Sequence, residues 1–66
     1  MTNSADRTAF LLGFLDGRKT KRYWSYNQAA RRFRGLQDST IQCYLNGRDD
    51  GVKGDFTRYD MMRAAA

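Results

Sequence analysis

The sequence predicts a small all-α domain of about four helices. Three observations lead to this class: the chain has only 66 residues, it contains no proline, and its apolar side chains recur at helical spacing in segments separated by glycines or capping residues. A chain of this length buries only about 60% of its unfolded surface. We therefore expect one domain over residues 1–66 with a small core.

The first helix is expected to run from about Ala5 to Asp16. At 3.6 residues per turn it places four apolar side chains on one broad face: Phe10, Leu11, Phe14 and Leu15. So wide an apolar surface indicates a helix at the centre of the core. Gly17 follows as the expected C-terminal cap, and Leu12 falls off the apolar face as a candidate dimer contact.

The second helix is expected to begin after Ser25. Gln28 lies three residues further on, which is the spacing of a capping box. In this motif the side chain of each residue accepts a hydrogen bond from the backbone amide of the other. Four side chains then fall within about 100° of one another: Tyr26, Ala29, Ala30 and Phe33. We expect these four to face the core.

The third helix is expected to begin at 37–39, with Asp38 or a neighbour as N-cap, and to end at Gly47. Its apolar stripe consists of Ile41, Tyr44 and Leu45. The opposite side carries a cluster without charge: Ser39, Gln42, Cys43 and Asn46. Side chains of this kind form hydrogen bonds and have no charge that would keep them merely solvated, so this face is suited to contact a partner.

The remaining tail has two possible structures. A fourth helix from about Asp55 to Arg63 would bring Phe56, Tyr59 and Met62 to one side as a lid on the core. A short β-hairpin around Asp50-Gly51 is the alternative, because Asp-Gly is also a hairpin signal.

Composition narrows the classes of function. The formal charge of +5 and the pI near 9.9 indicate an acidic partner, with nucleic acid as the first expectation. One cysteine and no histidine exclude an intrachain disulfide and any His-containing metal or catalytic group, so we expect no enzyme and no cofactor. The sequence has neither a membrane span nor the features of a signal peptide, which favours a cytoplasmic location.

The run SYNQAARRFRGLQDSTIQCYLNGR, at about 25–47, resembles the helix-turn-helix of Cro and lambda-repressor-like DNA-binding proteins. The matching positions are Ser25, Gln28, Ala30, Gly35, Ile41 and Leu45-Asn46-Gly47. The interval from Ala30 to Gly35 is one residue longer than in that family. Either the first helix or its turn holds an extra residue, with Arg34 as the candidate, or Arg31 takes the small-residue place at the helix crossing. We favour the first, because a guanidinium buried without a partner is costly.

The resemblance implies a sequence-specific DNA-binding transcriptional regulator of phage or plasmid type. It would act as a homodimer on a palindromic operator, with a recognition helix at about 37–46 in the major groove. The implied base contacts are Gln37, Ser39, Gln42, Cys43 and Asn46. The implied phosphate contacts are Arg18, Lys19, Lys21, Arg22, Arg31, Arg34, Thr40, Arg48 and Lys53.

Other interpretations stay open. A small phage-type inhibitor or adaptor could present Leu12, Tyr23, Trp24 or Tyr59 to a host protein, and the basic aromatic run at 18–26 could stack the bases of single-stranded RNA. The stretch LLGFLDG also looks like the helix motif of the LAGLIDADG homing endonucleases, in which Asp16 would hold a metal at a two-helix interface. That family requires a four-stranded saddle, for which this sequence supplies no strands.

Overall fold

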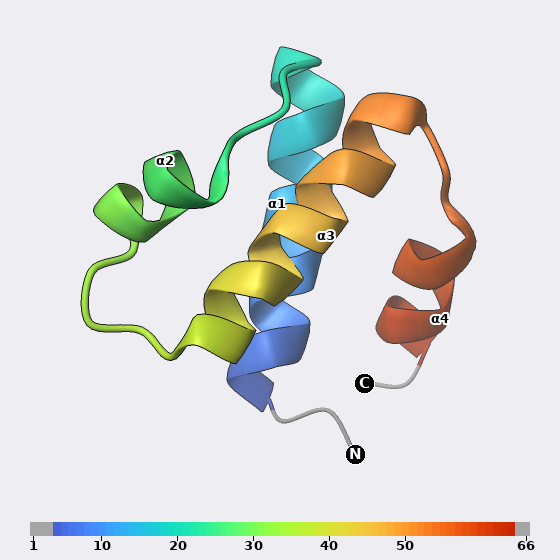
Figure 1. Cartoon of the computed structure of the whole chain (residues 1–66). Coiled ribbons are helices and arrows are strands. Elements are labelled where there is room, and N and C mark those ends of the chain that lie inside the picture. Colours follow the sequence, from blue (N-terminus) through green and yellow to red (C-terminus); the bar gives the residue numbers. More distant parts are fainter. Residues whose placement is uncertain (1–3, 65–66) are drawn as a thin grey trace.

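The computed structural model describes residues 4–64; residues 1–3 and 65–66, which the expected domain includes, lie outside the described part. The described chain forms four helices (Figure 1): α1 (Ser4–Thr20), α2 (Tyr26–Arg32), α3 (Asp38–Lys53) and α4 (Thr57–Ala64). No strand occurs within residues 4–64. The expected all-α class is confirmed, and the hairpin alternative for the tail is wrong.

The centre of the fold is the contact between α1 and α3, with α3 crossing in front of α1 in Figure 1. Gly13 and Gly17 of α1 lie against the backbone of α3, and Gly47 and Gly51 of α3 lie against the backbone of α1. A Cβ atom on any of the four would overlap a carbonyl oxygen of the opposite helix. Because the contacts advance in the same direction along both helices, α1 and α3 are parallel. Glycine is required here for close approach.

This packing explains why two helices are longer than the sequence analysis expects. Gly17 and Gly47 were expected to end helices, but α1 continues to Thr20 and α3 continues to Lys53. Both expectations are wrong, since each glycine serves the contact between helices rather than a C-terminal cap. The residue that caps α3 is Gly54, which has the left-handed φ of 76° that C-terminal caps commonly adopt.

The helices α2 and α4 lie on either side of the central pair (Figure 1). On one side, the ring of Phe33, which follows α2, lies 4.6 Å from the ring of Tyr44 in α3. On the other side, the rings of Phe56 and Tyr59 lie 4.9 and 4.1 Å from the ring of Phe14 in α1. Phe56, which precedes α4, and Tyr59 thus cover Phe14 as expected, and the lid is partial because no residue of α4 is buried.

The expected capping box at the start of α2 is present. The Gln28 backbone N–H donates to the Ser25 hydroxyl at 3.2 Å, and the Ser25 backbone N–H donates to the Gln28 side-chain oxygen at 2.9 Å. Two orphan amides at the helix N-terminus are thereby satisfied. The beginning of α2 could be read from the sequence because this motif depends on local residues alone.

Three expected core positions differ in the structure. Ala29 is fully buried whereas Ala30 is only partly buried, so the small residue at the contact with α3 is Ala29. Tyr26 is 38% exposed, because its hydroxyl donates to the Asp38 carboxylate at the surface. Leu15 is 53% exposed, because α1 turns its glycines rather than its leucines toward α3.

Candidate nucleic-acid interface

One side of α3 is left uncovered by the other helices. Five side chains follow it at spacings of three or four residues and form what we name the α3 outer face: Ser39, Gln42, Asn46, Asp49 and Lys53. At 100° per residue they lie about 140° around the helix from Gly47 and Gly51. The first three are exposed and uncharged. The chain bends at Gly35, where φ is 87°. The expected outward projection is confirmed for Ser39, Gln42 and Asn46, whereas Cys43 is half-buried.

Two other expected base contacts lie outside this face. Gln37 is exposed and occupies the N-cap position of α3 without a side-chain cap hydrogen bond. Cys43 is half-buried, and burial, followed by the nearby Asp6 carboxylate, raises the pKa of its thiol. The thiol is therefore protonated at neutral pH, and only its edge is accessible to a partner.

The cations of the chain gather in one part of the sequence. No acidic residue lies between Asp16 and Asp38, whereas seven of the 12 cations do. These seven are all exposed: Arg18, Lys19, Lys21, Arg22, Arg31, Arg32 and Arg34. None of them forms an ion pair with another described residue. In Figure 1 this basic segment, residues 18–34, passes from the top of α1 down to α2.

Helix termini explain part of this charge. Cations are stabilised near helix C-termini by the backbone dipoles, and α1 and α2 both end within the basic segment. Lys21, Arg22 and Arg34 lie just beyond these helix ends. Outside this segment the chain carries five cations and seven carboxylates. The net positive charge of the protein therefore comes entirely from this segment.

Arg48 fastens the start of the basic segment to the core. It is 3% exposed, and its guanidinium donates to the Arg22 carbonyl at 2.8 Å and to the hydroxyls of Tyr44 and Thr20 at 3.0 Å each. The guanidinium carbon also lies 4.2 Å from the centroid of the Trp24 ring. The expected phosphate contact at Arg48 is wrong, since this side chain is buried and its donors are used within the chain.

A second expected phosphate contact is also buried. Thr40 is 6% exposed, and its hydroxyl donates to the Asp6 carboxylate at 2.6 Å. It joins α3 to α1 and is not accessible to DNA. The expected contact at Lys53 stays possible, because this residue is exposed at the end of the α3 outer face.

The stretch that resembles the LAGLIDADG motif lies at a contact between two helices, as that resemblance predicts, but its aspartate has a different role. Residues 11–17 do lie at a two-helix interface, but Asp16 accepts a hydrogen bond from the Tyr44 hydroxyl at 2.6 Å. Within residues 4–64 there is no group of three His, Cys, Asp or Glu side chains that could hold a metal ion. Asp16 thus has a structural partner inside the helix pair.

The sequence analysis missed the role of the four glycines in the helix pair, although the sequence holds a signal for it. Residues 10–17 read FLLGFLDG and residues 44–51 read YLNGRDDG. Both stretches begin with an aromatic residue and share leucine, glycine, aspartate and glycine at the same four places. A search for internal repeats at an interval of 34 residues identifies this pair.

No family model matches the chain, and no curated protein or solved structure matches it. None of the helices within residues 4–64 has the length and apolar character needed to cross a bilayer.

Proposed function

We propose that the chain binds double-stranded DNA as a small sequence-specific regulator. The observation that carries this proposal is the basic segment, in which seven exposed cations occur without an intervening carboxylate and without an ion pair in the described chain. Unpaired cations on one part of a surface are suited to neutralise phosphates, which supply most of the affinity in non-specific DNA binding.

The α3 outer face is the proposed reader of base edges. The arginines of α2 and its following turn belong to the element that packs against α3. The amides of Gln42 and Asn46 can each bond N6 and N7 of adenine, and the Ser39 hydroxyl can donate or accept. The N-terminal half of the face carries these neutral groups, whereas Asp49 stands toward its C-terminal end. We therefore expect the N-terminal half of α3 to approach the bases.

Assembly on DNA follows from the size of the site. One small module reads few base pairs, so useful affinity usually requires two half-sites about one helical turn apart. We propose that two copies bind a palindromic operator and that the DNA brings these copies together. A regulator of phage or plasmid type acts where that DNA lies, which is the cytoplasm of the host cell. The proposal therefore agrees with the expected cytoplasmic location.

Salt dependence of binding to a random-sequence duplex, measured by fluorescence anisotropy, tests the proposal. We expect weak binding at low salt and a steep loss of affinity as salt rises, because each phosphate contact contributes roughly 0.9 to the slope of log K against log salt. The double variant Arg31→Gln/Arg34→Gln should lower that slope by roughly two units.

The matched control is Arg63→Gln in α4. Arg63 is an exposed arginine outside the basic segment, with its guanidinium 5.6 Å from the Tyr59 ring centroid, and its removal should leave the slope unchanged. No binding at low salt, or equal slopes for all three proteins, would contradict the proposal. Tighter binding to single strands that depends on Tyr23, which is 55% exposed, would favour base stacking instead.

A further inference from the structure

The two central helices expose different chemistry at equivalent positions. With the interval of 34 residues, the α3 outer face corresponds to an α1 outer face that consists of Ala5, Thr8, Leu12, Leu15 and Lys19. Asn46 and Asp49 on α3 thus stand where α1 has Leu12 and Leu15. Leu12 is 45% exposed and Leu15 is 53% exposed. Because α3 occupies the same place in the helix pair with polar residues, the fold does not require leucines there.

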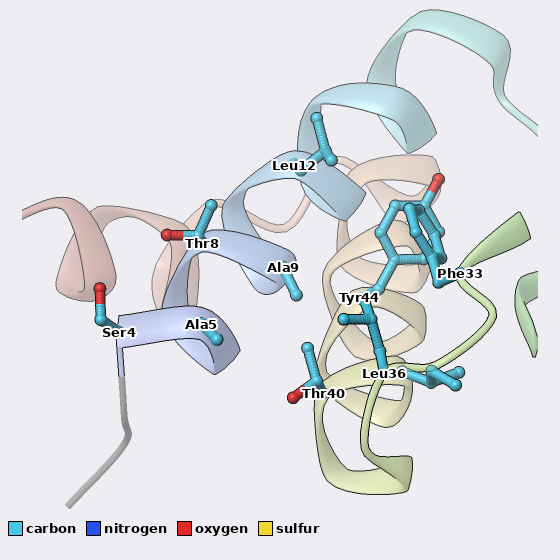
Figure 2. Close-up of a pocket in the computed structure, with 10 residues that line it drawn as sticks. Ser4, Ala5, Thr8, Ala9, Leu12, Phe33, Leu36, Thr40 and Tyr44 are labelled. Atoms are coloured by element: carbon cyan, nitrogen blue, oxygen red, sulfur yellow. The ribbon is translucent and has the colours of Figure 1, made fainter.

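Leu12 also lines an apolar groove that is open to solvent (Figure 2). One side of the groove is the N-terminal half of α1, the other is the turn after α2, and α3 forms the floor. The groove has a volume of about 510 Å³, within the range of ligand sites. Its apolar lining comes mainly from Ala5, Ala9, Leu12, Phe33, Leu36 and Ile41.

Four hydroxyl-bearing side chains line the groove, those of Ser4, Thr8, Thr40 and Tyr44, and the last two are already bonded within the chain. The Thr40 hydroxyl donates to Asp6, and the Tyr44 hydroxyl donates to Asp16. A polar small molecule would therefore find few groups to orient it, whereas apolar side chains fit this lining. Leu36, which is 49% exposed on the turn, lies across the groove from α1 and is buried only if a partner covers it (Figure 2).

The charge beside the groove indicates the character of that partner. Arg32 holds its guanidinium 5.7 Å from the centroid of the Phe33 ring, and it has no ion pair within residues 4–64. A second copy would bring another segment of seven cations toward this edge, which like-charge repulsion disfavours. The same cations would attract an acidic partner, which therefore fits this edge better than a second copy does.

The spacing of the lining fits a short helix. From Ala5 to Leu12 the groove follows about two turns of α1, or roughly 10 Å at 1.5 Å per residue. We propose that the groove docks an amphipathic α-helix of a partner protein, which places apolar side chains against Leu12 and Leu36 and carboxylates near Arg32. Such helices insert apolar anchors at spacings of three, four and seven residues.

The docking groove and the proposed base-reading face lie on different helices, although Arg32 beside the groove also belongs to the basic segment. The α1 and α3 outer faces point in opposite directions, because equivalent positions of two parallel helices joined by reciprocal glycine contacts face away from each other. The described chain is also flat, with Cα extents of 29 × 27 × 12 Å. One broad side is thus available to a protein partner while the other is available to DNA, and the docking proposal does not depend on DNA binding.

A designed peptide pair tests the proposal. The probe is a cross-linked helical peptide with leucines at positions i, i+4 and i+7 and glutamates elsewhere, and its match has lysines in place of the glutamates. Binding is measured by ¹⁵N–¹H correlation spectra of the whole chain. We expect saturable shifts around Leu12 and Leu36 with the acidic peptide and much weaker shifts with the basic peptide.

Variants distinguish the groove from a general apolar effect. Leu12→Asn, which copies the residue at the equivalent place in α3, should weaken acidic-peptide binding by about tenfold or more through lost apolar burial. Arg32→Gln should weaken it by about twofold to fivefold. The control Leu15→Asn removes a more exposed leucine of the α1 outer face that does not line the groove, and it should bind as the parent does. Thermal unfolding of each variant confirms that the chain is folded.

Several outcomes would overturn the proposal. These are no binding by the acidic peptide, equal binding of both peptides, or an equal loss in Leu12→Asn and Leu15→Asn. The last measurement is the oligomeric state of the parent chain, by sedimentation. A dimer that Leu12→Asn abolishes would assign the groove to a second copy and not to a partner helix.

Discussion

Gly13 of α1 and Gly47 of α3 occupy equivalent places in two parallel helices, and each lies directly against the backbone of the other helix. A Cβ on Gly13 would overlap the carbonyl oxygen of Tyr44, and a Cβ on Gly47 would overlap that of Phe10. The two backbones therefore approach more closely than any side chain would permit. Every other element of the fold is placed by this pair, since α2 packs on α3 and α4 packs on α1.

Gly47→Ala should strongly destabilise the fold. The added methyl group meets backbone atoms of Phe10 and Phe14, which cannot rotate away as a side chain can. Overpacking of this kind costs about 3 kcal/mol or more, a large part of what a domain of this size has. Urea unfolding followed by circular dichroism measures the loss.

The neighbouring residue provides the control. Asn46→Ala places the same side chain one position earlier on the exposed α3 outer face, where alanine is the better helix former, and should be neutral or stabilising by about 0.5 kcal/mol. Comparable stability of Gly47→Ala and Asn46→Ala would mean that α1 and α3 are not in backbone contact. It would instead fit the expectation from sequence that Gly47 only ends a helix.

Arg48→Met should loosen the connection between α3 and the basic segment. The variant keeps much of the apolar volume but removes the donors to Arg22, Thr20 and Tyr44, and it takes a donor from the buried Tyr44 hydroxyl. We expect a loss of about 3 kcal/mol, with a change in the fluorescence of Trp24, whose ring faces the guanidinium.

Arg31→Met is the matched control for this prediction, because Arg31 is exposed and has no ion pair in the described chain. It should change stability by no more than about 0.5 kcal/mol. If Arg48→Met unfolds no more easily than Arg31→Met, the hydrogen bonds of Arg48 do not support the fold.

The stability of the fold should fall in strongly alkaline solution because of Tyr44. Burial, with a further contribution from the hydrogen bond to Asp16, raises the pKa of the Tyr44 hydroxyl above its usual 10.0, although Arg48 opposes this. The folded state thus holds this proton more tightly than the unfolded state. The resulting stability is fully present below pH 10 and is lost as pH rises from there through the folded pKa.

Urea midpoints at several pH values, from neutral to above 10, test this prediction. The parent chain should lose stability above pH 10, and Tyr44→Phe should lose less over the same interval, because its aromatic ring carries no proton to release. Tyr26→Phe controls for the second tyrosine with a raised pKa, which is exposed and donates to Asp38. Parallel curves for the parent and Tyr44→Phe would contradict the role of Tyr44.

Local signals in the sequence were sufficient for much of the fold. The capping box at Ser25 and the left-handed Gly35 depend on near neighbours, so the start of α2 and the bend before α3 could be predicted. The apolar stripe of α3 likewise placed Ser39, Gln42 and Asn46 on the outside. In each case the determining interaction lies within a few residues along the chain.

The contact between helices could not be predicted in the same way. A glycine after an apolar run has the same local appearance whether it caps a helix or admits another backbone, and Gly17 and Gly47 do the second. Arg48 and Thr40 were expected at phosphates because basic and hydroxyl side chains are common there. Their burial depends on residues 26 or more positions away, such as Arg22 and Asp6.

Gln42→Ala tests whether the α3 outer face reads bases. Selection from random duplex first defines the preferred sequence, and affinity is then compared on that site and on an unrelated duplex. We expect a loss of roughly 1–3 kcal/mol on the preferred site and almost none on the unrelated one, because an amide that bonds a base edge contributes to discrimination rather than to phosphate attraction. Thr8→Ala, the equivalent position on the opposite α1 outer face, should change neither affinity. An equal loss on both duplexes would place Gln42 at the phosphate backbone, and no loss on either would remove α3 from the interface.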